Sequence, residues 1–187
     1  MAIFYKGIPV GTFWHLHDPA SVGFTPRSPM AAHHLDRIIN HVGRAQTVSS
    51  PYVSLTLSFS VAWIYANTAL SATPGFIYEI ELNDPLPLGA TLLDPVKELA
   101  AAVLSPLVLV GSNPYQHDGY PDLLVGLVGT RRSRLIHRVI KQPPGNPPRS
   151  AYISPALETF VRALRDAEML VFGSIPASCI KQKYVAS

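Results

Sequence analysis

The sequence has few of the residues that mark secreted or membrane-bound proteins. It contains one cysteine, Cys179, so no disulfide can form within the chain and a disulfide-stapled secreted scaffold is excluded. No apolar run approaches the roughly 20 residues of a membrane-spanning helix. The first ten residues lack the long apolar region of a secretory signal. We therefore expect a protein that acts in the cytoplasm, or that is delivered into the cytosol of a target cell, without a membrane partner.

Charge is also scarce. Charged residues make up 14% of the 187 residues and apolar residues 48%, which is the composition of a folded chain and not of a disordered one. This length suits a single domain, residues 1–187, around one core. The net charge is only +3, and the one tight basic cluster is Arg131, Arg132, Arg134 and Arg138. Such a cluster is typical of a solvated face, and a nucleic-acid interface is the alternative.

Familiar nucleotide and metal motifs are missing as well. The chain has no GxGxxG, no phosphate-binding loop and no CxxC pair. Three histidines, His33, His34 and His41, fall in one predicted helix, but a helical zinc pair needs the i, i+4 spacing with a glutamate between. The better interpretation of these histidines is surface exposure or helix packing, and no metal is expected.

The elements that the sequence does predict alternate irregularly between strands and helices. Apolar periodicity and capping residues predict helices over 31–45, 59–70, 94–104 and 154–164. Runs of β-branched and aromatic residues predict strands over 3–5, 51–57, 75–82 and from 169 onward, with 12–15 extended. Because no regular βαβ repeat is present, these elements predict an α+β fold.

Three short segments combine polar residues with apolar runs. The first is "FYKGIP", a strand ending in Lys6 and Gly7, and the second is "SPYVSLTLSFSVAWIYA". In the second, Ser54 and Thr56 share one face of a strand because side chains alternate with period two. The third is "DAEMLVFGSIP", where Glu168 directly precedes an apolar strand. Each motif alone fits ordinary strand chemistry, and the information lies in their order.

In that order the three motifs resemble the ADP-ribosyltransferase superfamily, in the branch related to cholera-toxin-like enzymes with an Arg-Ser-Glu pattern. The resemblance extends from Tyr5 to about Ile180. It implies an ADP-ribosyltransferase-like fold in which two small β-sheets, with flanking helices, form a cleft for NAD as the substrate. It also implies a compact toxin or effector domain, for which an immunity or antitoxin protein would be a partner.

The first motif departs from the family pattern. Lys6 stands where the family usually has arginine, and a lysine cannot make the planar bidentate contacts of a guanidinium. An alternative alignment places His15 at this position, since some relatives use histidine there. The resemblance implies that one of these two residues contacts the nicotinamide-proximal part of NAD or its phosphates. Gly7 would let the backbone approach the nicotinamide amide.

The second and third motifs supply the catalytic residues that the resemblance implies. Ser54 would shape the cleft and orient Glu168, with Thr56 in the same motif and Tyr65 lining the NAD site; Phe59 is a further lining candidate. Glu168 would bind the nicotinamide ribose and stabilise the cation that forms as nicotinamide leaves. That last role has a physical basis, since a fixed carboxylate offsets the charge of an oxocarbenium-like state.

The acceptor of the ADP-ribose group is less defined. Relatives that modify arginine often carry Glu or Gln two residues before the catalytic glutamate, and this chain has the shorter Asp166 there. Tyr115 and His117, in a turn-rich stretch, are expected to contribute to acceptor recognition. The function predicted is mono-ADP-ribosyl transfer to a protein or nucleic acid. The alternatives are NAD hydrolysis by the same fold and a non-catalytic nucleic-acid- or protein-binding module.

Overall fold

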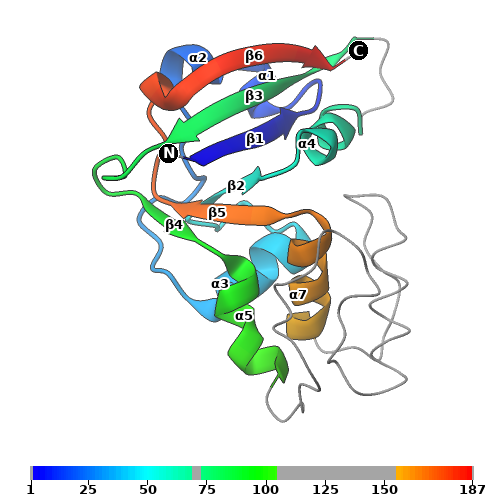
Figure 1. The fold of residues 1–187 in the computed structure, drawn as a ribbon, viewed down its shortest axis with the longest axis vertical. Coiled ribbons are helices and arrows are strands. Elements are labelled where there is room, and N and C mark those ends of the chain that lie inside the picture. The colour runs from blue at the N-terminus through cyan, green and yellow to red at the C-terminus, as the bar shows by residue number, and fades with distance from the viewer. Residues whose placement is uncertain (1, 69–72, 105–154, 187) are drawn as a thin grey trace.

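The computed structural model describes residues 2–68, 73–104 and 155–186. The strands are β1 (Ala2–Ile8), β2 (Tyr52–Thr56), β3 (Gly75–Leu82), β4 (Thr91–Leu93), β5 (Glu168–Phe172) and β6 (Ile180–Ala186) (Figure 1). The helices are α1 (Phe13–Leu16), α2 (Pro19–Val22), α3 (Leu35–Ile38), the π-helix η1 (Ile39–Gly43), α4 (Phe59–Ala66), α5 (Pro95–Leu104), α7 (Pro155–Arg165) and the 3-10 helix η3 (Ala177–Cys179). This mixture of helices with an antiparallel sheet is an α+β fold.

The described strands form one six-stranded sheet in the order β4-β5-β2-β1-β3-β6, with every pair antiparallel. The expectation of two small sheets is therefore wrong. The pairing is nonetheless uneven. β1 and β2 are paired at one position, Tyr5 with Thr56, whereas β1 is paired with β3 along its whole length, Ala2–Ile8 against Phe76–Leu82. We call β1, β3 and β6 the upper half, β4, β5 and β2 the lower half, and the Tyr5–Thr56 junction the seam.

Local chemistry explains where the best-predicted elements begin. The run "YVSLT" forms β2, as its β-branched and aromatic content predicts. Ser58 caps α4 by accepting a hydrogen bond from the amide of Val61, and Asp94 accepts one from the amide of Val96 at the start of α5. Both predicted caps are confirmed.

Three predicted elements differ from the structure. The helix predicted over 59–70 ends at Ala66. The stretch predicted as extended forms the short helix α1, because a turn precedes it: Gly11 has φ 78° and the hydroxyl of Thr12 donates to the carbonyl of Pro9. The helix predicted over 31–45 is shorter. It starts after His34, whose ring accepts from the amide of Asp36, and it widens into η1 before ending at Gly43.

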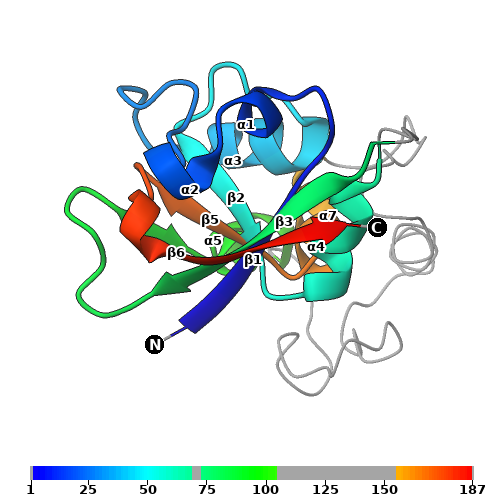
Figure 2. The ribbon, with the colours of Figure 1, turned by 90° about the horizontal axis from the view of Figure 1, so that it is seen from above.

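Helices cover the two halves differently. Figure 1 shows α3, α5 and α7 gathered beside the lower half, and α4 beside β1 of the upper half. Seen from above, α1 and α2 lie on one side of the upper strands and α4 on the other (Figure 2). Within the described ranges, no helix has the length and apolar character needed to cross a membrane.

The described core has three clusters, one on each face of the lower half and a smaller one of Ala62, Ala66, Ile77 and Ala186 between α4 and the upper half. On one face of the lower half, Tyr52 and Leu170 pack with Ile38, Val42 and Phe160 from the helices. On the opposite face, residues of both halves pack around three buried aromatics, Phe4, Phe24 and Tyr78. The cluster also includes Val53, Leu55 and Val171. The first face matters for function, because it continues along β2 and β5 from the apolar cluster to polar residues at the seam.

A close backbone contact fixes α4 against the upper half. A Cβ atom added at Gly7 would lie 2.0 Å from the carbonyl oxygen of Ala62, and one added at Gly75 would lie 2.3 Å from that of Ala66. Both distances are far inside van der Waals contact, so only glycine fits. This packing places α4 and the end of β1 at the edge of the seam.

Candidate active site

A cavity of about 260 Å³ opens at the seam, where β1 and β2 diverge. Strands from both halves and the three helices η1, α4 and α7 line it. Residues of the three sequence motifs in its wall include Tyr5, Lys6, Gly7, Ser54, Thr56, Tyr65, Asp166 and Glu168. The fold thus brings together segments that are more than a hundred residues apart in the sequence.

The position of Glu168 is set by hydrogen bonds on both sides of the turn that precedes it. Glu168 lies directly opposite Thr56 in the β2–β5 ladder. The hydroxyl of Thr56 donates to the carbonyl of Asp166 at 2.6 Å, and the amide of Leu57 donates to the carbonyl of Ala167 at 3.0 Å. Ala167 has φ 45°, in the left-handed region that an alanine rarely adopts. Strained residues of this kind concentrate at functional sites, where the surrounding structure holds them.

The environment of Glu168 disfavours its charged form. Burial raises the pKa of this carboxyl from 4.5 to about 7, and the negative charge of Asp166 adds to the rise. The hydroxyl of Ser54 and the cations of Lys6 and Arg165 oppose it. A group whose pKa is near 7 exchanges protons readily at neutral pH, and shifts of this size are typical of functional carboxyls.

Lys6 is shifted in the complementary direction. Burial lowers the pKa of its ammonium from 10.5 to about 8, and the charge of Glu168 counteracts part of that change. The Nζ atom donates a 2.8 Å hydrogen bond to the main-chain carbonyl of Ser54 and lies 5.7 Å from the ring centre of Phe24. Lys6 therefore crosses the seam from β1 to β2 and holds a cation next to the carboxyl.

His41 is the site residue that the sequence interpretation missed. Its Nε2 lies 2.6 Å from the hydroxyl oxygen of Ser54, and it lines the same cavity. Burial, together with the nearby Lys6, lowers the pKa of the imidazole to about 3, so the ring is neutral. The sequence did contain one indication that His41 is buried. This histidine lies three residues after Ile38, on the buried face of the helix, where a polar ring needs a hydrogen-bond partner.

Asp166 is already engaged within the chain. Arg165 donates two hydrogen bonds to its carboxylate, one of 2.6 Å to Oδ2, and Tyr65 donates a third of 2.8 Å to the same oxygen. Burial raises the pKa of Tyr65, and the charge of Asp166 adds to the rise, so the phenol stays protonated. Asp166 lines the cavity beside Glu168, but its oxygens face these two donors.

The other predicted residues lie elsewhere. His15 lies in α1 with its ring stacked on Phe76 at 5.2 Å, and it is absent from the cavity wall. Phe59 is 40% exposed and packs edge-on against Tyr5 and Tyr184 outside the cavity. Tyr115, His117 and the arginine cluster at 131–138 fall outside the described residues. In the part of the chain that the structure describes, no group of three His, Cys, Asp or Glu residues could hold a metal ion.

A second cavity of about 190 Å³ adjoins the first. The two share Lys6, Gly7, His41, Thr47 and Ser54. The second is bounded by the stretch after β1 and by the stretch between α2 and α3, including Thr12 and Arg27. The two cavities therefore adjoin each other at residues of β1, η1 and β2.

Comparison with known proteins gives limited information. No protein-family model matches the sequence, and no curated protein does. Among solved structures, full-length CARDS toxin aligns with a TM-score of 0.48 at 10% identity, and the nicked form of CARDS toxin aligns with 0.48 at 11% identity. Each alignment covers 98% of this chain, which spans 24% and 25% of those chains. A likeness below a TM-score of 0.5 establishes neither a shared family nor a shared activity.

Proposed function

We propose that the protein is an NAD-dependent mono-ADP-ribosyltransferase that cleaves the nicotinamide–ribose bond and transfers ADP-ribose to an acceptor. One observation carries the proposal: Lys6, Ser54 and Glu168 come from three distant segments and line one cavity at the seam. They are the residues of the motif trio "YKG", "YVSLT" and "AEMLVF". A second cavity shares Lys6 and Ser54 with the first, and we propose that NAD occupies both.

Glu168 would stabilise the cation formed in the reaction. When the C–N bond breaks, nicotinamide leaves with the bonding electron pair, and positive charge develops on the ribose ring. A fixed carboxylate in a cavity of low dielectric stabilises such a charge more than water does. The acceptor then attacks the ribose carbon and releases its proton. Because the pKa of Glu168 is about 7, the carboxylate form needed for this role builds up as pH rises through neutrality.

Lys6, Ser54 and His41 would hold this carboxylate in place. The ring of His41 contacts the hydroxyl of Ser54, and that hydroxyl favours the charged form of Glu168. A neutral imidazole adds no charge that would compete with the developing cation. Lys6 connects β1 to the backbone of Ser54 and so holds the two halves of the sheet together beside the cavity.

We do not propose an arginine side chain as the acceptor of ADP-ribose, because Asp166 would have to bind its guanidinium group. A carboxylate that already accepts hydrogen bonds from Arg165 and Tyr65 has little capacity left for an incoming arginine. A neutral nucleophile on a macromolecule, or water, fits this arrangement better. The assignment of Tyr115 and His117 to acceptor recognition stays a prediction, as do a toxin or effector role and an immunity or antitoxin partner.

The proposal is tested by nicotinamide release. Purified protein is incubated with NAD labelled in the nicotinamide ring, and free nicotinamide is measured for the wild type and for Glu168→Gln. The substitution removes a focused electrostatic contact, so we expect a loss of about 100-fold or more in rate. Glu81→Gln, which changes a carboxyl on β3 away from the cavity, is the matched control and should keep full activity. Equal rates for wild type and Glu168→Gln would refute the proposal.

The products and the pH profile sharpen the result. Free ADP-ribose as the sole product identifies hydrolysis, and labelled macromolecules in a lysate identify transfer. We expect the rate to rise as pH increases through about 7, because Glu168 must lose its proton, and to fall above about 8, because Lys6 loses its charge. A flat profile between pH 5 and pH 8 would contradict the role of Glu168.

A further inference from the structure

Beyond the residues of the motif trio, the same cavity is lined by a buried arginine, Arg162 on α7. Arg162 is 5% exposed. One arm of its guanidinium donates a 2.9 Å hydrogen bond to Glu158, one turn earlier on the helix. Its Nε atom is buried and has no hydrogen-bond partner among the described residues. The roles proposed for the site so far do not involve this residue.

The packing around Arg162 is close enough to be specific. A Cβ atom added at Gly43 would lie 2.2 Å from the hydroxyl oxygen of Thr159, so η1 approaches α7 as closely as a glycine permits. After η1, Ala45 adopts φ 53° and, with Thr47, lines the cavity. Arg162 on α7 and Asp166, the residue after its end, are four residues apart; the amide of Asp166 donates to the carbonyl of Arg162, and both residues line the cavity. Close packing between η1 and α7 therefore holds the part of the cavity wall that contains Arg162.

A buried N–H group without a partner destabilises a fold, because it has lost its hydrogen bond to water and gained none in return. A guanidinium offers several donors in a rigid plane that matches the oxygen atoms of phosphate groups. Glu158 occupies one arm of Arg162, and the buried Nε–H has no partner among the described residues, so a ligand oxygen would reach it after a shift of the side chain on binding. An oxyanion oxygen is the group that would satisfy it best, because a hydrogen bond between two charged groups is stronger than a neutral one.

We propose that Arg162 binds a phosphate-class anion at the α7–η1 wall of the cavity. The inference rests on the proposed function in so far as NAD would bring such a group, and it deepens that function by adding an anchoring residue outside the three motifs. The anion belongs either to the dinucleotide or to a second, phosphate-bearing ligand. Both sources present the same oxygen atoms to Arg162.

The test uses inorganic pyrophosphate and does not depend on catalysis. Thermal unfolding is followed for the wild type over a pyrophosphate titration, and we expect a saturable rise in Tm. Arg162→Lys keeps the positive charge but loses Nε, so we expect its affinity for pyrophosphate to fall about tenfold or more. Lys97→Gln removes an exposed cation on α5 and is the control, with unchanged affinity.

A second variant guards against a folding defect. In Arg162→Gln, Glu158 would lose its partner, whereas Glu158→Gln combined with Arg162→Gln removes both charges together. The double variant should fold and should fail to bind pyrophosphate. Equal pyrophosphate affinity in the wild type and in the folded Arg162 variants overturns the proposal, and so does the absence of any shift in the wild type.

Inhibition kinetics identify the source of the anion. Pyrophosphate that competes with NAD, and raises its KM alone, places the phosphate of the dinucleotide on Arg162. Pyrophosphate that lowers kcat without changing KM places a second ligand there. If the wild type releases no nicotinamide, the proposed function fails, while the pyrophosphate titration still decides whether Arg162 binds an anion.

Discussion

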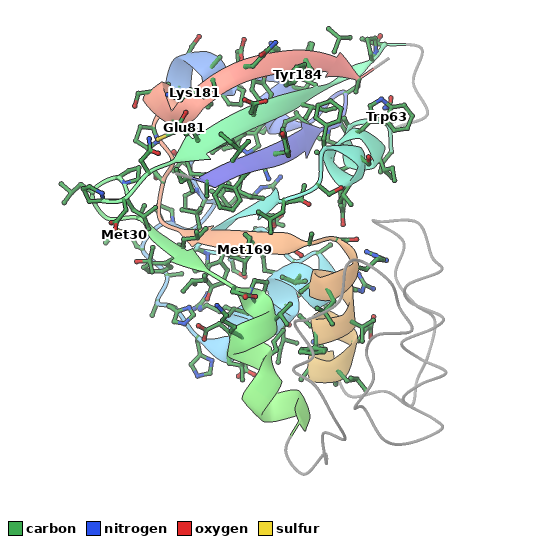
Figure 3. All side chains as sticks on the ribbon, viewed as in Figure 1. Met30, Trp63, Glu81, Met169, Lys181 and Tyr184 are labelled. Atoms are coloured by element: carbon green, nitrogen blue, oxygen red, sulfur yellow. The ribbon has the colours of Figure 1, made fainter. Side chains whose placement is uncertain are left out.

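The two halves of the sheet differ in where their polar side chains lie. In the upper half, ion pairs and hydrogen bonds lie at the surface: Lys181 and Glu81 face each other at 3.6 Å, and Tyr184 donates to Glu79 (Figure 3). In the lower half and at the seam, polar side chains turn inward. These are His41, Ser54, Thr56, Asp166 and Glu168, and all five line the cavity.

This difference separates structural stability from chemistry. Surface pairs in water contribute little to stability, and removing one costs little. Buried charged groups are costly unless they are paired, and their pKa values shift as a result. Away from the seam the upper half therefore serves as a regular scaffold, whereas the lower half and the seam, including Lys6 of β1, hold groups in states that cost stability and suit a reactive site.

The largest effect should come from the contact that joins the upper half to α4. Gly7→Ala would push a methyl group into the carbonyl of Ala62, and we expect a loss of about 3 kcal/mol in the free energy of unfolding. Gly89→Ala is the control, since Gly89 has φ 77° but open space around it, and it should cost roughly 1 kcal/mol. Urea denaturation measures both. Similar costs at the two positions would show that α4 can shift away from β1.

A smaller effect, of opposite sign in the two halves, should follow from replacing carboxyls. The pKa of Glu168 is raised in the folded state, so the fold loses stability as pH rises from 4.5 to about 7. Glu168→Gln should therefore raise Tm at pH 8, by roughly 2–4 °C, and much less at pH 5. In the upper half the pKa of Glu81 is lowered, first by Asn83, so Glu81→Gln should not raise Tm at pH 8. A Glu168→Gln variant less stable than wild type at pH 8 would contradict the comparison.

Replacing Lys6 tests whether a buried basic group at the seam also costs stability, as the buried carboxyl of Glu168 does. The folded-state pKa of Lys6, about 8, lies below the ordinary lysine value of 10.5. Burying the charged ammonium therefore costs stability below about pH 8, and this cost disappears as the pH rises to 10.5. Lys6→Met should accordingly stabilise the fold at pH 7 and lose that advantage at pH 10.5. Thermal unfolding at the two pH values measures the difference. A stabilisation that does not change with pH would assign the effect to packing alone.

The smallest effect should appear at Ala167. Its φ of 45° suits glycine, so Ala167→Gly should stabilise the protein by about 0.5 kcal/mol. The same change should lower the rate of nicotinamide release, because the turn that orients Glu168 becomes looser. Denaturation and activity are measured on one preparation. A variant that is both more stable and equally active would show that the strained turn has no role in positioning the carboxyl.

Sequence reasoning succeeded where local chemistry determines the structure. The strand around Ser54 is specified by its β-branched and aromatic neighbours, and the caps at Ser58 and Asp94 are specified by their side chains. Lys6, Ser54 and Glu168 were chosen from the resemblance of three ordered motifs to a known family; the fold brings all three to one cavity, and their roles stay predictions.

Sequence reasoning failed where contacts between residues far apart in the sequence determine the structure. The number of sheets depends on one pairing, between Tyr5 and Thr56, that no local pattern encodes. His41 looked like one of several helical histidines, and only the approach of β2 gives it Ser54 as a partner. Arg162 lies on a helix with a strong polar and apolar division, and its burial follows from the packing of η1 against α7.

The contact at Gly7 also changes what variation among related chains would mean. Any relative that keeps α4 against β1 must keep glycine at this position, because the carbonyl of Ala62 leaves no room for a side chain. Invariance there would report helix–strand packing, whether or not a nucleotide binds. The neighbouring Lys6 carries no such constraint on its side chain, so exchange of Lys6 for arginine or histidine among relatives would be the informative record of selection for chemistry at the seam.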